Sequence, residues 1–232
     1  MSEAPKAALM QSLRRLVRGL SVLFWCLPLA LLVCVEGAVG LQNNASAWLH
    51  AMGILPPVLA TALLLFGVRE LGHFQPQERI WQESLDRAKL LGLVNFGLSP
   101  FVFWWNRLPG ELAFSVSVGL LALSGLLFLF NLNHVLQRLA AMLPDETLRA
   151  DTQLFTSLNL GLMLAVLALL GVYALLDQVD SLPQLLIEFL DRLFEARRGL
   201  LVLLILLPVA MTMTLLWKMK EVVLASVFRQ GE

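Results

Sequence analysis

The chain has 232 residues, of which 58% are hydrophobic and 15% are charged, and its mean hydropathy is +0.76. Soluble domains are closer to half apolar and a quarter charged, so the composition argues against a soluble protein. It predicts an all-α, polytopic integral membrane helical bundle that forms a single domain over residues 1–232. The 17 basic and 17 acidic residues cancel, which gives no reason to expect nucleic acid as a partner.

Six apolar stretches approach the ~20 residues that a helix needs to cross the hydrocarbon core of a bilayer. We therefore expect about six transmembrane helices, near residues 19–40, 52–68, 90–105, 112–133, 155–176 and 199–217. The first follows a basic N-terminal segment, as a signal peptide would. It is longer than the apolar region of a signal peptide, and further spans follow it, so we expect an uncleaved first helix.

The polar segment 69–89 precedes the third span. A helix is expected to begin after Pro76 and either to lie along the membrane surface or to run into the third span. Its expected apolar side consists of Ile80, Trp81, Leu85 and Ala88. Farther on, Pro100 disfavours helical geometry at Ser99, which predicts a kink. The short connection 108–111 then predicts a tight antiparallel hairpin between the third and fourth spans.

Small residues recur at i, i+4 and i+7 in the fourth and fifth spans. Such stripes let helix backbones approach closely in lipid, and the alternative is chance in helices rich in alanine and glycine. The predicted helix-packing residues are Ser115, Gly119, Ala122, Gly161, Ala165 and Ala168.

A polar group closes the apolar part of the fourth span, where Asn131, Asn133 and His134 lie close together in the sequence. These side chains either line a cavity that opens to the cytoplasm or simply mark a helix end among lipid headgroups. Both readings stay open.

An amphipathic pattern occupies residues 182–196, between the fifth and sixth spans. Its apolar residues recur at helical spacing and its charged residues take the opposite side. It is too charged to span the bilayer, so we expect one interfacial helix that lies in the membrane plane or docks on a partner. The apolar face includes Leu182, Leu185, Leu186, Phe189 and Leu193.

The distribution of positive charge predicts the orientation. Thirteen of the 17 Lys and Arg residues fall in the N-terminus, in the 69–89 and 134–153 connections, and in the C-terminus. Because basic residues favour the cytoplasmic side, both termini should be cytoplasmic. The short loops and the charge bias favour a bacterial inner (plasma) membrane.

The sequence contains no intramembrane zinc-protease motif, no nucleophile elbow, no phosphate-binding loop and no histidine pair at helical spacing. We expect no cofactor and no metal. The leading hypothesis is a non-catalytic structural or accessory subunit that contacts membrane lipids and other membrane-protein subunits or a second copy. Deleting 182–196 should then release a partner. The alternatives are a small-solute transporter or channel, with a route past Asn95, Asn131 and Asn133, and an enzyme acting on lipids.

Overall fold

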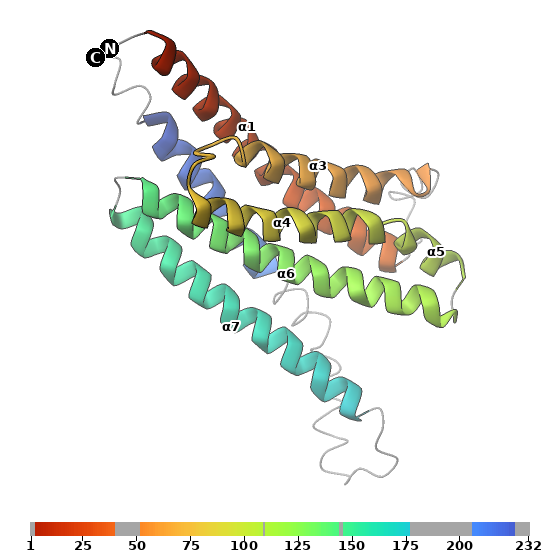
Figure 1. Cartoon of the computed structure of the whole chain (residues 1–232). Coiled ribbons are helices and arrows are strands. Elements are labelled where there is room, and N and C mark those ends of the chain that lie inside the picture. Colours follow the sequence, from red (N-terminus) through yellow and green to blue (C-terminus); the bar gives the residue numbers. More distant parts are fainter. Residues whose placement is uncertain (1–2, 40–51, 109, 144–145, 177–205, 226–232) are drawn as a thin grey trace.

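The structure, a computed structural model, describes residues 3–39, 52–108, 110–143, 146–176 and 206–225. These residues are all-helical and contain no strand (Figure 1), which confirms the predicted class. The predicted interfacial helix, with Leu182, Leu185, Leu186, Phe189 and Leu193, lies outside the described residues.

The described helices are α1 (Glu3–Val39), α3 (Leu55–Leu71), α4 (Arg79–Leu98), α5 (Phe101–Arg107), α6 (Leu112–Met142) and α7 (Glu146–Leu176). α1, α6 and α7 are longer than the apolar stretches that predict them, whereas α3 has the predicted length. Residues 206–225 form a further helical stretch, here called the C-terminal helix.

Among the described residues, three stretches are long and apolar enough to cross a membrane by length and composition. They are Met10–Gly37 in α1, Leu112–Met142, which is α6, and Glu146–Ala168 in α7. This finding supports membrane association and covers the first, fourth and fifth of the six expected spans.

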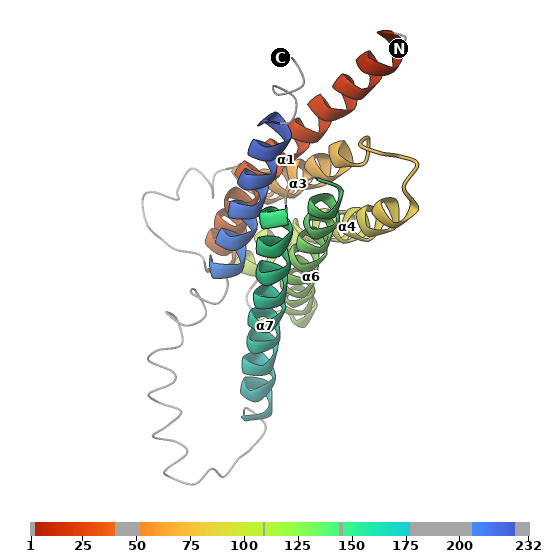
Figure 2. The same ribbon diagram turned by 90° about the vertical axis from the view of Figure 1, so that its left-hand side faces the viewer.

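The helices pack largely in chain order. α1 contacts α3, α3 contacts α4, α4 contacts α6, and α6 contacts α7, while the short α5 touches both α1 and α6. The C-terminal helix runs beside α1 (Figure 2), where the Phe24 and Trp217 rings lie 5.5 Å apart. The first and last helices are therefore neighbours, and the core lies between them and α3, α4 and α6.

The start of α4 is a buried amphipathic helix rather than a surface one, and it continues directly into the third span. Trp81, Leu85 and Ala88 are fully buried, and the Trp81 Nε1 donates to the Phe74 carbonyl oxygen at 2.9 Å. The prediction for Ile80 is wrong, since 54% of this residue is exposed. Successive helical residues point about 100° apart, so a face centred on Trp81 turns Ile80 outward.

A break at Pro100 and the predicted hairpin are both present, but Ser99 keeps helical dihedral angles (φ −59°, ψ −33°), so the predicted loss of helical geometry at Ser99 is wrong. α4 ends at Leu98 and α5 begins at Phe101, because Pro100 has no backbone N–H to continue the ladder. α5 and α6 then fold back on each other, and the Trp105 Nε1 donates to the Ser115 Oγ across the hairpin at 3.2 Å.

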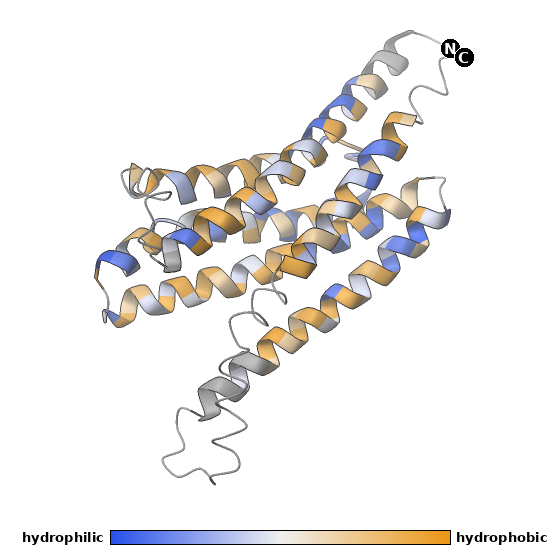
Figure 3. Ribbon diagram, turned by 180° about the vertical axis from the view of Figure 1, so that it is seen from behind, coloured by the Kyte–Doolittle hydropathy of each residue, from blue (hydrophilic) through white to orange (hydrophobic). Residues whose placement is uncertain are grey.

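The connections that are rich in basic residues gather at one end of the bundle. Toward the left of Figure 1 lie the start of α1, the α3–α4 connection, the end of α6, the start of α7 and the end of the C-terminal helix. Hydrophilic residues are concentrated at this same end in Figure 3, and the middles of the helices are largely apolar. The described basic segments therefore share one end of the bundle, and the cytoplasmic position of that end stays a prediction.

Candidate functional site

Buried polar side chains join different helices at three places among the described residues. The Ser124 Oγ of α6 donates to the Asn95 Oδ1 of α4 at 2.5 Å. Thr61 of α3 and Ser99, at the end of α4, lie 3.2 Å apart between their hydroxyl oxygens. The third place, which we call the asparagine–threonine node, contains Asn133, Asn159 and Thr212.

The node ties together α6, α7 and the C-terminal helix. The Thr212 Oγ1 accepts from the Asn133 Nδ2 at 2.9 Å and from the Asn159 Nδ2 at 3.3 Å. It donates to the Pro208 carbonyl oxygen at 2.8 Å. All three members are almost completely buried, with exposed fractions of 0%, 1% and 0%. One hydroxyl therefore bridges three helices.

The position of the node follows from the cost of burying polar groups. Asn133 lies on the face of α6 that also buries Leu129, Leu136 and Ala140. An amide in such a place must be hydrogen-bonded, because desolvation without a partner costs about 1–3 kcal/mol. Its own helix supplies only the Leu129 carbonyl oxygen as an acceptor, at 3.0 Å. The Thr212 Oγ1 accepts a second hydrogen bond from the same amide nitrogen.

An ion pair joins two of the node's three helices, α7 and the C-terminal helix. The Lys218 Nζ of the C-terminal helix is 2.6 Å from the Asp151 Oδ2 of α7, and the side chains are 44% and 41% exposed. Partly exposed pairs contribute little free energy, about 0–1 kcal/mol. This pair therefore acts mainly on the register of the C-terminal helix against α7.

The structure does not bring together the polar cluster predicted from Asn131, Asn133 and His134. The Asn131 Nδ2 donates to the Leu127 carbonyl oxygen of its own helix at 2.9 Å, and Asn131 and His134 are only half-buried. Because neighbours on a helix face different directions, Asn133 alone enters the core. Asn159 and Thr212 were not among the predicted site residues, although an asparagine inside an apolar helix is a signal for a partner on another helix.

The residues of the hypothetical solute route occupy separate places. Asn95 bonds Ser124 between α4 and α6, and Asn133 belongs to the node. Asn131 bonds its own backbone. In the described residues, each of these amides is thus engaged in a hydrogen bond of its own, and they do not form one polar path.

The predicted small-residue stripes face away from the core of the chain. Ser115, Gly119 and Ala122 of α6 are exposed, as are Gly161, Ala165 and Ala168 of α7. Nothing lies within 4 Å of a Cβ added at Gly119 or Gly161. On both helices the buried residues lie almost half a turn around from the stripe. Packing of these stripes on another chain stays a prediction.

Close backbone approach occurs instead between α1 and α3, where Gly19 meets Gly67. A Cβ added at Gly19 would lie 2.9 Å from the Gly67 carbonyl oxygen and 2.5 Å from the Leu71 Cδ1. A Cβ added at Gly67 would lie 2.8 Å from the Leu23 Cγ. This crossing was not predicted, because each helix contributes a single glycine to it and no stripe of small residues marks it.

No group of three or more His, Cys, Asp or Glu residues that would suit a metal ion occurs in the part of the chain that the structure describes.

No protein-family model matches the sequence, and comparisons with curated proteins and with solved structures found no match.

Proposed function

We propose that the chain is a six-span integral membrane protein that acts as a non-catalytic structural or accessory subunit of a membrane complex. The observation that carries this proposal is the outward direction of two small-residue stripes, on α6 and α7. Lipid places no demand for small residues on a helix surface, whereas a second helix does. The partner is either another membrane subunit or a second copy of the chain.

Six spans are the number that the arrangement supports best. α3, the kinked pair α4–α5 and the C-terminal helix run alongside the three stretches that suit a membrane. An even number of spans leaves both termini on one side. The basic connections gather at that same end, and the excess of positive charge makes it the cytoplasmic side of a bacterial inner membrane.

The buried polar groups support a scaffold role. Asn95 and Asn133 each form a hydrogen bond to another helix, which makes them contributors to helix association. Solute transport, the alternative function, has less support because two of its three route residues are engaged in this way.

Leucine at the two stripe glycines is expected to release the partner and to leave the fold intact. Gly119→Leu combined with Gly161→Leu adds bulk where nothing lies within 4 Å, so thermal unfolding of the chain itself should not change. Co-purification from native membrane in mild detergent, quantified by mass spectrometry, should show at least about a tenfold loss of the companion, since close approach needs small residues.

Gly97→Leu is the matched control. Gly97 also has nothing within 4 Å of an added Cβ, but it belongs to α4 and to neither stripe. It should keep the companion at the level of the unmodified chain. Full retention of the companion by the double variant, or a wild-type chain that purifies as a monomer with nothing bound, would remove the basis of the proposal.

A further inference from the structure

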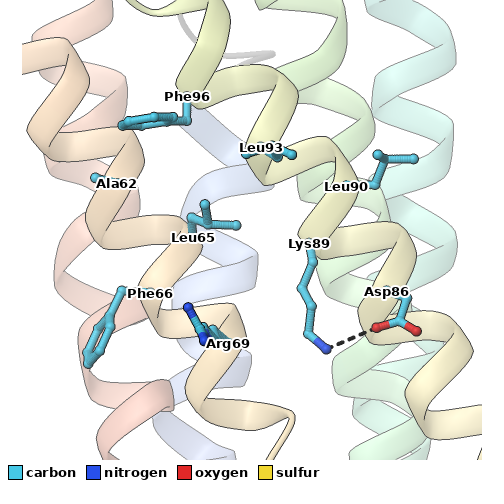
Figure 4. Close-up of a pocket in the computed structure, with 9 residues that line it drawn as sticks. All are labelled: Ala62, Leu65, Phe66, Arg69, Asp86, Lys89, Leu90, Leu93 and Phe96. Carbon is cyan, nitrogen blue, oxygen red and sulfur yellow. Dashed lines mark hydrogen bonds and ion pairs between the residues drawn. The ribbon is translucent and has the colours of Figure 1, made fainter.

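A groove between α3 and α4 opens to the outside of the bundle and has a volume of about 610 Å³. This lies within the ~300–1,000 Å³ that is typical of small-molecule sites. Its walls are mainly apolar, and a few charged groups stand at one end (Figure 4). The apolar lining consists of Ala62, Leu65 and Phe66 from α3 and Leu90, Leu93 and Phe96 from α4.

One end of the groove is lined by charged side chains and the rest by apolar ones. Because α3 and α4 run in opposite directions, later residues of α3 lie beside earlier residues of α4. Arg69, near the end of α3, lies with Lys89 and Asp86 of α4 (Figure 4). Ala62 and Phe96 lie about 10 Å farther along, two helical turns from Arg69 and Lys89. The charged end belongs to the α3–α4 connection, which is the end where basic residues gather. The groove therefore has a charged end, lined by Arg69, Lys89 and Asp86 and here called its mouth, and an apolar remainder.

The mouth of the groove carries excess positive charge. Lys89 pairs with Asp86 at 2.9 Å, and its side chain is still 32% exposed. Arg69 has no hydrogen bond or ion pair from its side chain to any described residue. A third cation, Arg18 of α1, stands 5.7 Å from the centre of the Phe66 ring. Two cations and one carboxylate therefore line this end of the groove.

The acidic residue next to Arg69 in the sequence does not line the groove. Glu70 follows Arg69 in the sequence but turns toward α1, where its Cβ would lie 3.1 Å from a Cβ added at Gly19. Guanidinium and ammonium groups in such a position bind phosphate oxygens strongly, and guanidinium does so with two parallel hydrogen bonds.

We propose that this groove binds an anionic glycerophospholipid, with the headgroup phosphate at Arg69 and Lys89 and an acyl chain along Leu65, Leu93 and Phe96. Basic pockets between helices at the cytoplasmic face favour anionic headgroups, and the apolar length of the groove suits a hydrocarbon chain. The inference rests on the proposed position of α3 and α4 in the membrane, but not on the proposed role as a subunit.

Native mass spectrometry of the full chain in mild detergent tests the site with phosphatidylglycerol and with phosphatidylcholine of the same acyl chains. We expect phosphatidylglycerol to bind about tenfold more tightly, because the two lipids differ in headgroup charge. Arg69→Gln combined with Lys89→Gln should remove this preference and leave phosphatidylcholine retention unchanged. Equal binding of the two lipids to the unmodified chain would overturn the proposal.

The matched control is Arg79→Gln combined with Arg87→Gln, which removes the same charge from the same end of α4. Both residues are exposed and neither lines the groove, so the preference should persist. A loss as large as that of the groove variant would show a general charge effect and overturn the site.

Two further measurements locate the lipid. Ala62→Phe fills the apolar part without changing charge and should reduce phosphatidylglycerol retention, and unchanged retention would place the lipid elsewhere. Glycerol phosphate lacks acyl chains and should give no adduct, whereas an adduct as abundant as that of the phospholipid would overturn the lipid assignment. Unaltered thermal unfolding of each variant shows that it is folded. Partner co-purification is measured separately, so failure of the subunit role is distinguishable from failure of the lipid site.

Discussion

Replacing Gly19 with leucine is expected to lower the free energy of unfolding by about 3 kcal/mol, the upper part of the usual range for overpacking. The new Cβ would meet the Gly67 carbonyl oxygen at 2.9 Å and the Leu71 Cδ1 at 2.5 Å. The carbonyl belongs to the α3 backbone, and Leu71 is fully buried, so neither can move aside without separating α1 from α3. Unfolding in mixed micelles, followed by tryptophan fluorescence, measures the change.

Two further variants separate the effect of the close contact between α1 and α3 from the effect of a leucine side chain in general. Gly19→Ala already introduces the Cβ and should destabilise the protein, though less than leucine does. Gly119→Leu places the same side chain on α6, where nothing lies within 4 Å. It should change the free energy by no more than about 0.5 kcal/mol, as surface substitutions usually do. Equal effects at positions 19 and 119 would refute the crossing of α1 and α3 at Gly19.

Replacing Thr212 with valine is expected to lower the free energy of unfolding by about 1–3 kcal/mol, the cost of leaving buried polar groups unsatisfied. Valine has nearly the shape of threonine but cannot accept hydrogen bonds from the Asn133 and Asn159 amides. Hydrogen bonds between membrane helices average about 0.6 kcal/mol and reach about 1.7 kcal/mol. Because the Thr212 hydroxyl bridges three helices, we expect each of its hydrogen bonds to other helices to be near the upper value.

The same helix supplies the control. Thr214 is exposed, and among the described residues its hydroxyl bonds only the Ala210 carbonyl oxygen of its own helix, at 2.9 Å, so Thr214→Val should be close to neutral. Asn133→Leu should destabilise the T212V protein less than the unmodified chain, because residues in one hydrogen-bond network couple. Additive effects of the two substitutions would show that Asn133 and Thr212 do not depend on each other.

Local sequence features account for much of the fold. Long apolar runs predict α1, α6 and α7, because a bilayer selects for length and hydropathy. Pro100 predicts the break between α4 and α5, since a missing N–H acts locally. The charge distribution predicts which connections share one end of the bundle.

The side that each helix turns inward was decided by the tertiary structure. The stripe that contains Gly119 and the core face that contains Phe128 both repeat at helical spacing on α6. An amphipathic helix shows its exposed side by its polar residues, but α6 is apolar on both sides, so the sequence does not show which side is buried. The same ambiguity groups Asn131 with Asn133, although only Asn133 reaches Thr212, 79 residues away in the chain.

The sequence by itself determined that the chain is helical, apolar and asymmetric in charge. Only the tertiary structure decided that Gly19 meets Gly67, that Thr212 joins Asn133 and Asn159, and that Arg69 and Lys89 share a groove. The physical reason is that hydropathy, proline and charge act on each segment independently of the others. Close packing and buried hydrogen bonds instead depend on a second helix, whose register no local pattern encodes.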